Sequence, residues 1–333
     1  MKQKWGFLLR LVISLAAVAG LVFGLRGKLV EALQILRHGL QWPWFLWAGV
    51  IYLVATVIIS WRLQLILKVQ EVKLGFWQTF YLSLLGLFFN LFFPSAMGGD
   101  VAKGYFAYQY SGKKLGSLTG VVLDRLLGFL TLILVALTAI LFYSKKINLP
   151  IVDHLIYGSV AVVALGLLFF ASRRFANIFR FLGFLVPSAK WREKLSDIYG
   201  AIQEYRNHRS LLIFCVVLSF AGQFVYLLDV YFLSRALGIG LSPWPFFVLM
   251  PVVSFTSLAP SISGLGVREA GFVFFFKSLI PSPQAFALSL LYDLLYYGYA
   301  IGVGIIFAFK GGLKRTMMEG LEVVEEHKGG WND

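Results

Sequence analysis

The chain has 333 residues, of which 59% are hydrophobic and 14% are charged, and its formal net charge is +14. Soluble domains carry about 25% charged residues, and the charges here lie between long apolar stretches, so the composition excludes an ordinary soluble enzyme. The basic residues sit in short segments beside apolar ones, a pattern that indicates the positive-inside rule and attraction to anionic lipid headgroups. We therefore expect membrane lipids, and no nucleic acid, as partners.

Long apolar segments recur in chain order, and a bilayer span takes about 20 apolar residues. We predict six full spans, at residues 11–25, 44–61, 119–142, 155–171, 211–234 and 284–309. The first of these is open to a second interpretation, as a signal peptide. The second precedes a predicted basic loop that contains Arg62. The expected fold is an all-α polytopic membrane protein, with residues 1–333 in a single membrane domain.

Two other apolar stretches are interrupted. Residues 76–93 break at 94–100, and residues 246–258, which are too short to span, break at 259–269 before a second short apolar piece at 270–280. We interpret each stretch as a re-entrant hairpin that enters and leaves the membrane on one side. The alternative makes both stretches full spans that are tilted or packed against other helices.

The two breaks share the pattern Pro-Ser-x-x-Gly-x-x-Val, at residues 94–101 and 260–267. An acidic residue in a membrane segment follows each break about 30 residues later, namely Asp124 and Asp293. If each half contains four elements, the second half starts on the opposite side of the membrane from the first. The pattern therefore predicts an inverted-topology repeat, an architecture of many transporters.

The first repeat is expected to cover about residues 5–143 and the second about residues 151–310. Residues 172–210, a basic stretch with apolar residues at helical spacing, are predicted to be either a cytoplasmic amphipathic helix on the membrane surface or a solvated connector. Residues 311–333 are predicted to form a cytoplasmic tail. Lys and Arg are concentrated in the segments that this arrangement places inside, so we expect both termini in the cytoplasm and the protein in the cell (inner) membrane.

Irregular backbone at membrane depth survives only where protein or a water-filled cavity satisfies its N–H and C=O groups. The candidates for such a site are Ser95, Gly98, Gly99, Ser261, Gly264 and Gly266. The glycines would let the backbone turn, and the start of the following half-helix would present N–H donors that suit an anion such as a lipid phosphate. The alternative is that these glycines only make tight turns.

Ionisable residues near or inside the apolar segments form the second set of site candidates. They are Asp100, Lys103, Asp124, Arg125, Arg268, Glu269 and Asp293. Such groups are rare in a bilayer and usually face the protein interior or a water path. Arg268 suits a phosphate because a guanidinium binds two oxygens at once. Asp100, Glu269 or Asp124 would hold basic residues in place or carry a coupling proton, and structural ion pairing is the alternative for Asp124 and Arg125.

Other chemistry is sparse in the sequence. It contains no HExxH, GxSxG, P-loop or dinucleotide fingerprint, so we expect no catalytic residue, no metal and no cofactor. The one cysteine, Cys215, excludes a disulfide within the chain. Four tyrosines cluster beside Asp293, and they are interpreted either as lining a polar path or as packing and interfacial anchors; they are Tyr292, Tyr296, Tyr297 and Tyr299.

Three ordered motifs resemble those of one membrane family. They are Phe93-Pro94-Ser95-x-x-Gly98-Gly99-Asp100-Val101-x-Lys103, Leu123-Asp124-Arg125-x-x-Gly128, and Pro260-x-x-x-Gly264-x-Gly266-Val267-Arg268-Glu269-Ala270. Over nearly its whole length the chain is similar to the flippase-like domain family found as the transmembrane region of lysylphosphatidylglycerol synthases. In the synthases this region is thought to move aminoacylated phosphatidylglycerol between leaflets, while a separate soluble domain performs the aminoacyl transfer.

The resemblance implies lipid handling without synthase activity, because this chain ends soon after its last predicted span. Lys103 stands where many members have Arg, which keeps the charge but weakens bidentate phosphate binding at that position. We expect translocation of an anionic phospholipid or a polyprenyl-phosphate-linked lipid between leaflets. The alternatives are a membrane partner that presents lipid to a separate glycosyltransferase or aminoacyltransferase, and a membrane-embedded transferase.

Overall fold

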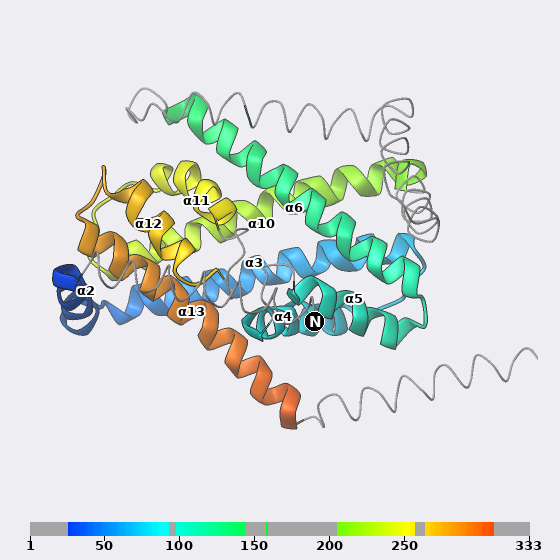
Figure 1. The fold of residues 1–333 in the computed structure, drawn as a ribbon. Helices are drawn as coiled ribbons and strands as arrows, with labels where there is room; N and C mark the ends of the chain where they lie inside the picture. Colours follow the sequence, from blue (N-terminus) through cyan, green and yellow to red (C-terminus); the bar gives the residue numbers. More distant parts are fainter. Residues whose placement is uncertain (1–25, 93–97, 144–157, 159–204, 257–263, 310–333) are drawn as a thin grey trace, which may run out of the picture. The chain divides into compact units, whose positions relative to one another are not determined.

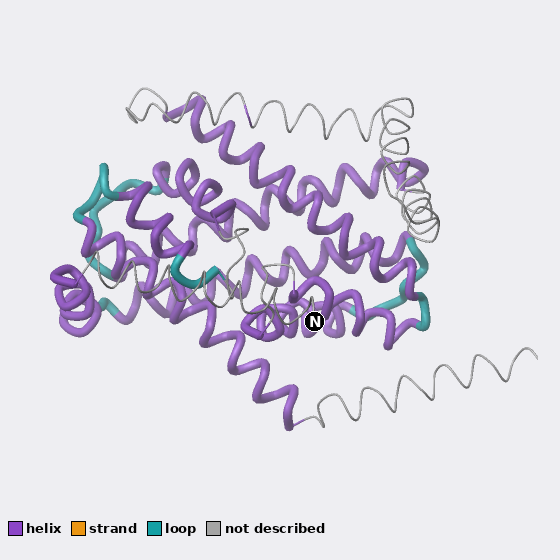
Figure 2. Tube along the Cα trace, viewed as in Figure 1, coloured by secondary structure: helices purple, strands orange, loops and turns teal. Residues whose placement is uncertain are grey.

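The computed structural model describes residues 26–92, 98–143, 158, 205–256 and 264–309, and within these ranges all regular structure is helical (Figure 2). In chain order the elements are α2 (Arg26–Gly39), α3 (Trp42–Val69), α4 (Phe76–Phe92), α5 (Gly98–Ser111), α6 (Lys114–Tyr143), the 3₁₀ helix η3 (Tyr205–His208), α10 (Arg209–Ala236), α11 (Trp244–Thr256), α12 (Val267–Phe276) and α13 (Ser282–Phe309) (Figure 1). The predicted all-α class is confirmed for these residues.

Four helices are long and apolar enough to cross a membrane: α3, the Lys114–Thr138 part of α6, α10 and α13. A helix of 28 residues, the length of three of them, extends about 42 Å, whereas the hydrocarbon core of a bilayer is about 30 Å thick. These four helices coincide with four of the six predicted spans. The other two, at residues 11–25 and 155–171, lie outside the described residues, as do most of the predicted connector and the tail.

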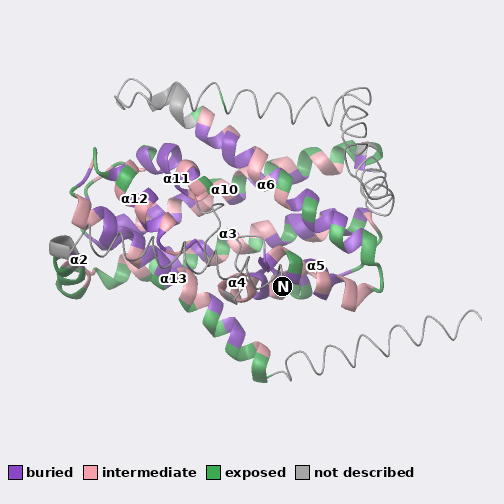
Figure 3. Cartoon of the chain, viewed as in Figure 1, coloured by how far each residue is buried: buried purple, intermediate pink, exposed green. Residues whose placement is uncertain are grey.

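One side of α3 shows why these helices belong in lipid. Its exposed apolar residues include Leu46, Val50 and Val54, which recur every four residues and so share one face. Trp42 and Trp47, near the start of the helix, are also exposed, as the green segments at this end of α3 indicate (Figure 3). A continuous apolar face of this kind is rare on a soluble monomer. Together with the four long helices, it defines a multi-pass membrane protein.

The helix α3 corrects one prediction. The apolar segment was expected to end at Trp61 before a basic loop, but the helix continues to Val69 and contains Arg62. The Arg62 side chain is only 4% exposed. Hydropathy decreases at a charged residue, whereas the helix continues because this charge is buried and has its own partners, which are described below.

The helices α11 and α12 form an antiparallel pair at the second break. The rings of Phe246, near the start of α11, and Phe276, at the end of α12, have centroids 5.4 Å apart. At the other end of the pair, a Cβ atom on Gly271 would lie 2.8 Å from Oγ1 of Thr256. The helix α12 also packs against α13 (Figure 1). The second break is therefore enclosed by two short helices.

The helices α4 and α5 approach closely at the first break. The N–H of Gly99 donates to Oδ1 of Asn90 at 2.6 Å. A Cβ atom on Gly99 would collide with the carbonyl oxygen of Gly86 and with the Asn90 side chain, so the close approach requires glycine at this position. Each break thus lies between two helices that are shorter than the four long ones. That each pair forms a re-entrant hairpin on one side of the membrane stays a prediction.

The chain divides into two compact units, which we describe separately. Unit 1 comprises Met1–Val57, Tyr81–Ala102 and Phe224–Gly312, and unit 2 comprises Ile58–Phe80, Lys103–Gln223 and Leu313–Asp333. In unit 1, α13 packs against both α2 and α12, and α12 packs against α11. Unit 2 has a core of buried apolar side chains contributed by Ile66, Val69, Leu123, Leu127, Tyr205 and Cys215.

Candidate functional site

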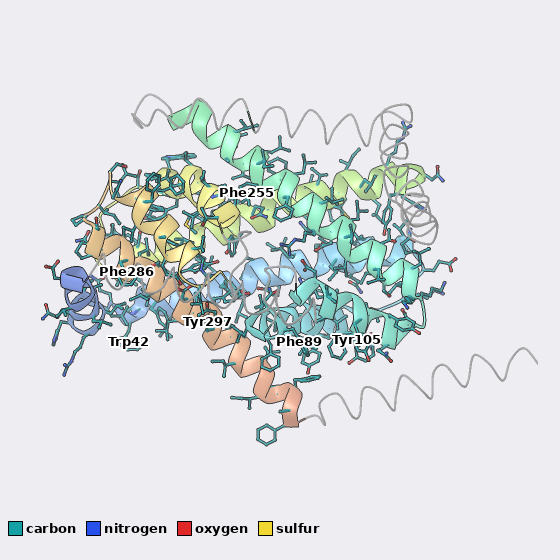
Figure 4. The ribbon with its side chains drawn as sticks, in the orientation of Figure 1. Trp42, Phe89, Tyr105, Phe255, Phe286 and Tyr297 are labelled. Atoms are coloured by element: carbon teal, nitrogen blue, oxygen red, sulfur yellow. The ribbon has the colours of Figure 1, made fainter. Side chains whose placement is uncertain are left out.

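Arg268, in the first turn of α12, is buried against α13. Its Nη2 donates to the Asp293 carboxylate and to the hydroxyl of Tyr297, the latter at 3.1 Å; Tyr297 is labelled on α13 in Figure 4. The guanidinium carbon lies 5.2 Å from the ring centroid of Tyr292 and 5.6 Å from that of Tyr296. Aromatic rings at these distances attract a cation. The charge of Arg268 is therefore stabilised by one carboxylate and by several tyrosines of α13.

The glycines of the second break direct Arg268 toward α13. Gly264 and Gly266 have φ angles of 80° and 82°, in the left-handed region that favours glycine. The Arg268 N–H donates to the Gly264 carbonyl at 2.9 Å, and the Ala270 N–H donates to the Gly266 carbonyl at 3.1 Å. Gly266 is the N-cap residue of α12 and makes no side-chain cap. The two glycines therefore make a tight turn, and α12 begins directly after it.

Glu269 adds a second carboxyl beside Arg268. It is buried, and its carboxyl interacts electrostatically with that of Asp293. Among the described residues, Oε2 of Glu269 and Nε of Arg268 have no hydrogen-bond partner. The cluster of Arg268, Glu269 and Asp293 thus retains one unused acceptor and one unused donor.

Asn90 of α4 connects the first break to this cluster. Its Oδ1 accepts the hydrogen bond from Gly99, and its Nδ2 donates to the hydroxyl of Tyr296 at 3.3 Å. The Tyr296 ring is one of those that surround Arg268. Both breaks therefore reach the same buried site within unit 1. Sequence reasoning missed Asn90, although a polar amide in a Phe-rich apolar segment was the available signal.

A further buried carboxylate, Asp229 of α10, belongs to the same unit. It is fully buried, and neither of its carboxylate oxygens has a hydrogen-bond partner among the described residues. It lies close enough to Tyr52, Tyr226 and Tyr299 to interact electrostatically with their hydroxyls. The hydroxyl of Tyr226 pairs with that of Tyr292, which itself flanks Arg268. Asp229 stands out in the sequence as an acidic residue in an apolar segment, but it is absent from the predicted site.

Asp124 lies in unit 2 and forms an ion pair with Arg62. Nε of Arg62 donates to Oδ1 of Asp124 at 2.7 Å, and Nη2 donates to the Asp124 carbonyl at 3.0 Å. Nη1 of Arg62 donates to Oγ of Ser219 at 2.9 Å. Arg125 lies over the ring of Phe129, 4.9 Å from its centroid. Asp124 therefore has an ion-pair partner, Arg62, which agrees with its alternative interpretation, and a role of Asp124 in binding stays a prediction.

The predicted site residues divide between the two units. Unit 1 contains Gly98, Gly99, Asp100, Gly264, Gly266, Arg268, Glu269 and Asp293. Unit 2 contains Lys103, Asp124 and Arg125. Ser95 and Ser261 lie outside the described residues. The structure thus brings Arg268, Glu269 and Asp293 together directly, and it connects Gly99 to them through Asn90.

Long apolar helices, with a buried polar cluster that two breaks between shorter helices approach, define a helical multi-pass membrane protein. The family model described as the lysylphosphatidylglycerol synthase TM region matches residues 7–304. The chain therefore belongs to this family, which confirms the resemblance seen in its motifs. No curated protein and no solved structure matches the sequence. Membership of the family indicates a function related to membrane lipids.

Proposed function

We propose that this protein binds an anionic phospholipid or a polyprenyl-phosphate-linked lipid and moves the headgroup between leaflets. The observation that supports this proposal is the convergence of both breaks on Arg268. The turn at Gly264 and Gly266 leads directly into Arg268, and Gly99 reaches it through Asn90 and Tyr296. In transporters, interrupted helices that meet at one polar site are where the substrate binds.

The chemistry of Arg268 fits a phosphate. A guanidinium remains charged at every physiological pH and presents donors in a fork that matches two phosphate oxygens. Its Nε is unused among the described residues, while Nη2 is shared between Asp293 and Tyr297. A phosphate would approach Nε, and the tyrosine hydroxyls would supply further donors. The acyl or polyprenyl chain would stay in lipid beside the exposed apolar faces of the long helices.

The proposal places the protein in the cell membrane with both termini in the cytoplasm, in agreement with the distribution of Lys and Arg. A membrane-associated transferase is the expected partner, as an enzyme that makes or uses the lipid on one leaflet. The orientation can be checked with reporter fusions at the C-terminus that are active on only one side of the membrane. An active periplasmic reporter at that end would contradict it.

The function is tested by reconstituting the purified protein into liposomes that contain a fluorescent phosphatidylglycerol and measuring how fast the label reaches the outer leaflet. We expect movement with the native protein, loss of movement in Arg268→Ala, and partial movement in Arg268→Lys, because a point charge replaces a two-donor fork. Arg209→Ala is the matched control, since Arg209 is an exposed residue at the start of α10.

Three results would count against the proposal. Unchanged lipid movement in a folded Arg268→Ala protein would show that Arg268 is not needed for it. No movement with the native protein, but movement after a transferase is added, would favour lipid presentation. Formation of a modified lipid by the protein alone, from a donor and a lipid acceptor, would favour a membrane-embedded transferase.

A further inference from the structure

The buried acidic groups of unit 1 outnumber the buried basic groups. Among the described residues of this unit, the one buried side chain that is a cation in neutral water is Arg268. The buried carboxyls are three, namely Asp229, Glu269 and Asp293. Burial of uncompensated charge in a membrane protein is strongly unfavourable. Protons, a metal ion or a bound ligand would relieve this imbalance among the described residues. The described residues contain no group of three or more His, Cys, Asp and Glu that could hold a metal ion.

The geometry of two of the carboxyls favours a proton. Glu269 directly follows Arg268 in the first turn of α12, Asp293 pairs with Arg268, and both carboxyls are buried. Two buried carboxyls beside one guanidinium cannot both ionise without an electrostatic cost, which a shared proton removes. Asp293 accepts a hydrogen bond from Arg268, whereas Oε2 of Glu269 has no partner among the described residues. The two carboxyls are therefore treated as one site that shares a proton.

We propose that the Glu269–Asp293 carboxyl pair is a proton-binding site, and that its proton and an anionic lipid headgroup at Arg268 bind together. The second half of this inference rests on the proposed function, and the first half does not. The proton comes from water and is taken up by one carboxylate, so one negative charge beside Arg268 disappears. With only one carboxylate left beside it, the Arg268 guanidinium binds a phosphate with less electrostatic repulsion.

The groups that face the pair come from several helices. Around the pair are Arg268 of α12 and, from α13, Tyr292, Tyr296 and Tyr297. Tyr226 of α10 and Asn90 of α4 reach this cluster through the hydroxyls of Tyr292 and Tyr296. Arg268 is the one permanent cation among them. Asp229 of α10 is a further buried carboxyl of unit 1, near Tyr226, and its oxygens have no hydrogen-bond partner among the described residues.

Coupling between the two ligands is reciprocal. If the proton strengthens binding of the anion, then the anion strengthens binding of the proton by the same factor. For one linked proton, the apparent affinity for the lipid falls by up to about tenfold for each pH unit above the titration of the pair. A lipid-moving protein with this linkage would respond to a proton gradient, because lipid release and proton release would favour the same, more alkaline side.

The first test concerns the proton alone. Infrared difference spectroscopy of the purified protein in nanodiscs detects the C=O stretch of a protonated carboxyl. At neutral pH we expect a protonated-carboxyl band in the native protein that is lost or reduced in Glu269→Gln. The band should be unchanged in Glu71→Gln, because Glu71 is an exposed carboxyl of unit 2. Asp293→Asn serves as the second variant if Glu269→Gln does not fold, and it should remove the same band.

The second test measures binding of phosphatidylglycerol, in nanodiscs of phosphatidylcholine, across a range of pH. We expect the affinity to fall with rising pH in the native protein and to become nearly independent of pH in Glu269→Gln. A native protein whose band is unaffected by both variants would overturn the proton site. Phosphatidylglycerol binding with no pH dependence would overturn the coupling. A band that behaves as expected, with no lipid bound at any pH, would contradict the proposed function and leave the proton site supported.

Discussion

Of the described arginines, two are buried, and the protein holds them in opposite ways. Arg62 donates from Nε, Nη1 and Nη2 to Asp124 and Ser219, and one carboxylate balances one guanidinium. Arg268 has one nitrogen unused among the described residues and faces two carboxyls instead of one. A fully satisfied, balanced pair fixes two helices together, whereas a partly satisfied, unbalanced cluster can respond to a proton or a ligand. The contrast separates a structural ion pair from a candidate binding site.

The duplicated motif makes this contrast unexpected. When the two Pro-Ser-x-x-Gly-x-x-Val motifs are aligned, Ala102 occupies the position of Arg268, and Lys103 occupies that of Glu269. Asp293 pairs with Arg268, at the end of the second break, whereas Asp124 pairs with Arg62 of α3, before the first break. The acidic residues recur in sequence, but their partners come from different elements. The two similar motifs therefore do not imply that Asp124 and Asp293 have similar roles.

The largest expected effect breaks the balanced pair. Asp124→Asn leaves Arg62 buried without a carboxylate, which typically costs about 3–5 kcal/mol. Asp293→Asn should cost less, about 1–3 kcal/mol, because Glu269 remains close to Arg268. Thermal unfolding in detergent, followed for both variants beside the native protein, measures the difference. Equal losses of stability in the two variants would remove the distinction between the two arginines.

A smaller effect is expected at the contact between the first break and the Arg268 site. Gly99→Ala adds a methyl group that meets the Gly86 carbonyl and the Asn90 side chain, and overpacking of this kind costs about 1–3 kcal/mol. It should displace Asn90 from Tyr296 and weaken lipid binding. Gly298→Ala is the matched control, since a Cβ atom there meets nothing within 4 Å. If both variants bind lipid like the native protein, the first break does not contribute to the site.

The neutral hydrogen-bond partners of the two arginines offer a finer comparison. Ser219→Ala removes the acceptor of Arg62 Nη1 and should lower stability by about 1 kcal/mol, with no change in lipid binding. Tyr297→Phe removes a hydroxyl 3.1 Å from Arg268 Nη2 and should instead change the pH dependence of lipid binding. Thermal unfolding and lipid titration of both variants give the answer. A change in lipid binding in Ser219→Ala, with a change in stability alone in Tyr297→Phe, would contradict the roles assigned to the two arginines.

The smallest expected effect comes from an exposed ion pair, Glu71 with Lys113. The hydrogen bond from Lys113, together with its charge, lowers the pKa of the Glu71 carboxyl. Because the pKa is lower in the folded state, the pair contributes stability above the unfolded pKa and loses it as the pH falls through the folded value. Glu71→Gln should therefore differ slightly from the native protein at neutral pH and not at all in acid. A difference that grows in acid would contradict this assignment.

Local sequence features predicted much of the fold. Each of the four spans within the described residues is a predominantly apolar run, and both breaks carry glycines where the following helix begins. The sequence also identified Arg268, Glu269 and Asp293 as exceptional, because charged residues stand out in apolar segments. Their pairing needed the structure, since Asp293 lies 25 residues from Arg268.

What the sequence did not predict depends on distant contacts. Arg62 was assigned to a loop because hydropathy treats a charge as an interruption, while its neutralising partner lies 62 residues away on α6. A single Asn90 hardly changes a hydropathy profile, although its side chain connects the first break to Tyr296 of α13, 206 residues away in the sequence. Such pairings are set by how helices pack together, and one sequence without aligned relatives does not reveal them.

The burial of Cys215 has a practical consequence. It is the one cysteine of the chain and has no exposed surface in the core of unit 2, and a thiol enclosed by apolar side chains reacts slowly. The native protein therefore provides a nearly silent background for site-directed labelling. Fluorophores attached to pairs of introduced cysteines, for example at the exposed positions Trp42 and Trp77, could follow distance changes in single molecules without any substitution of Cys215.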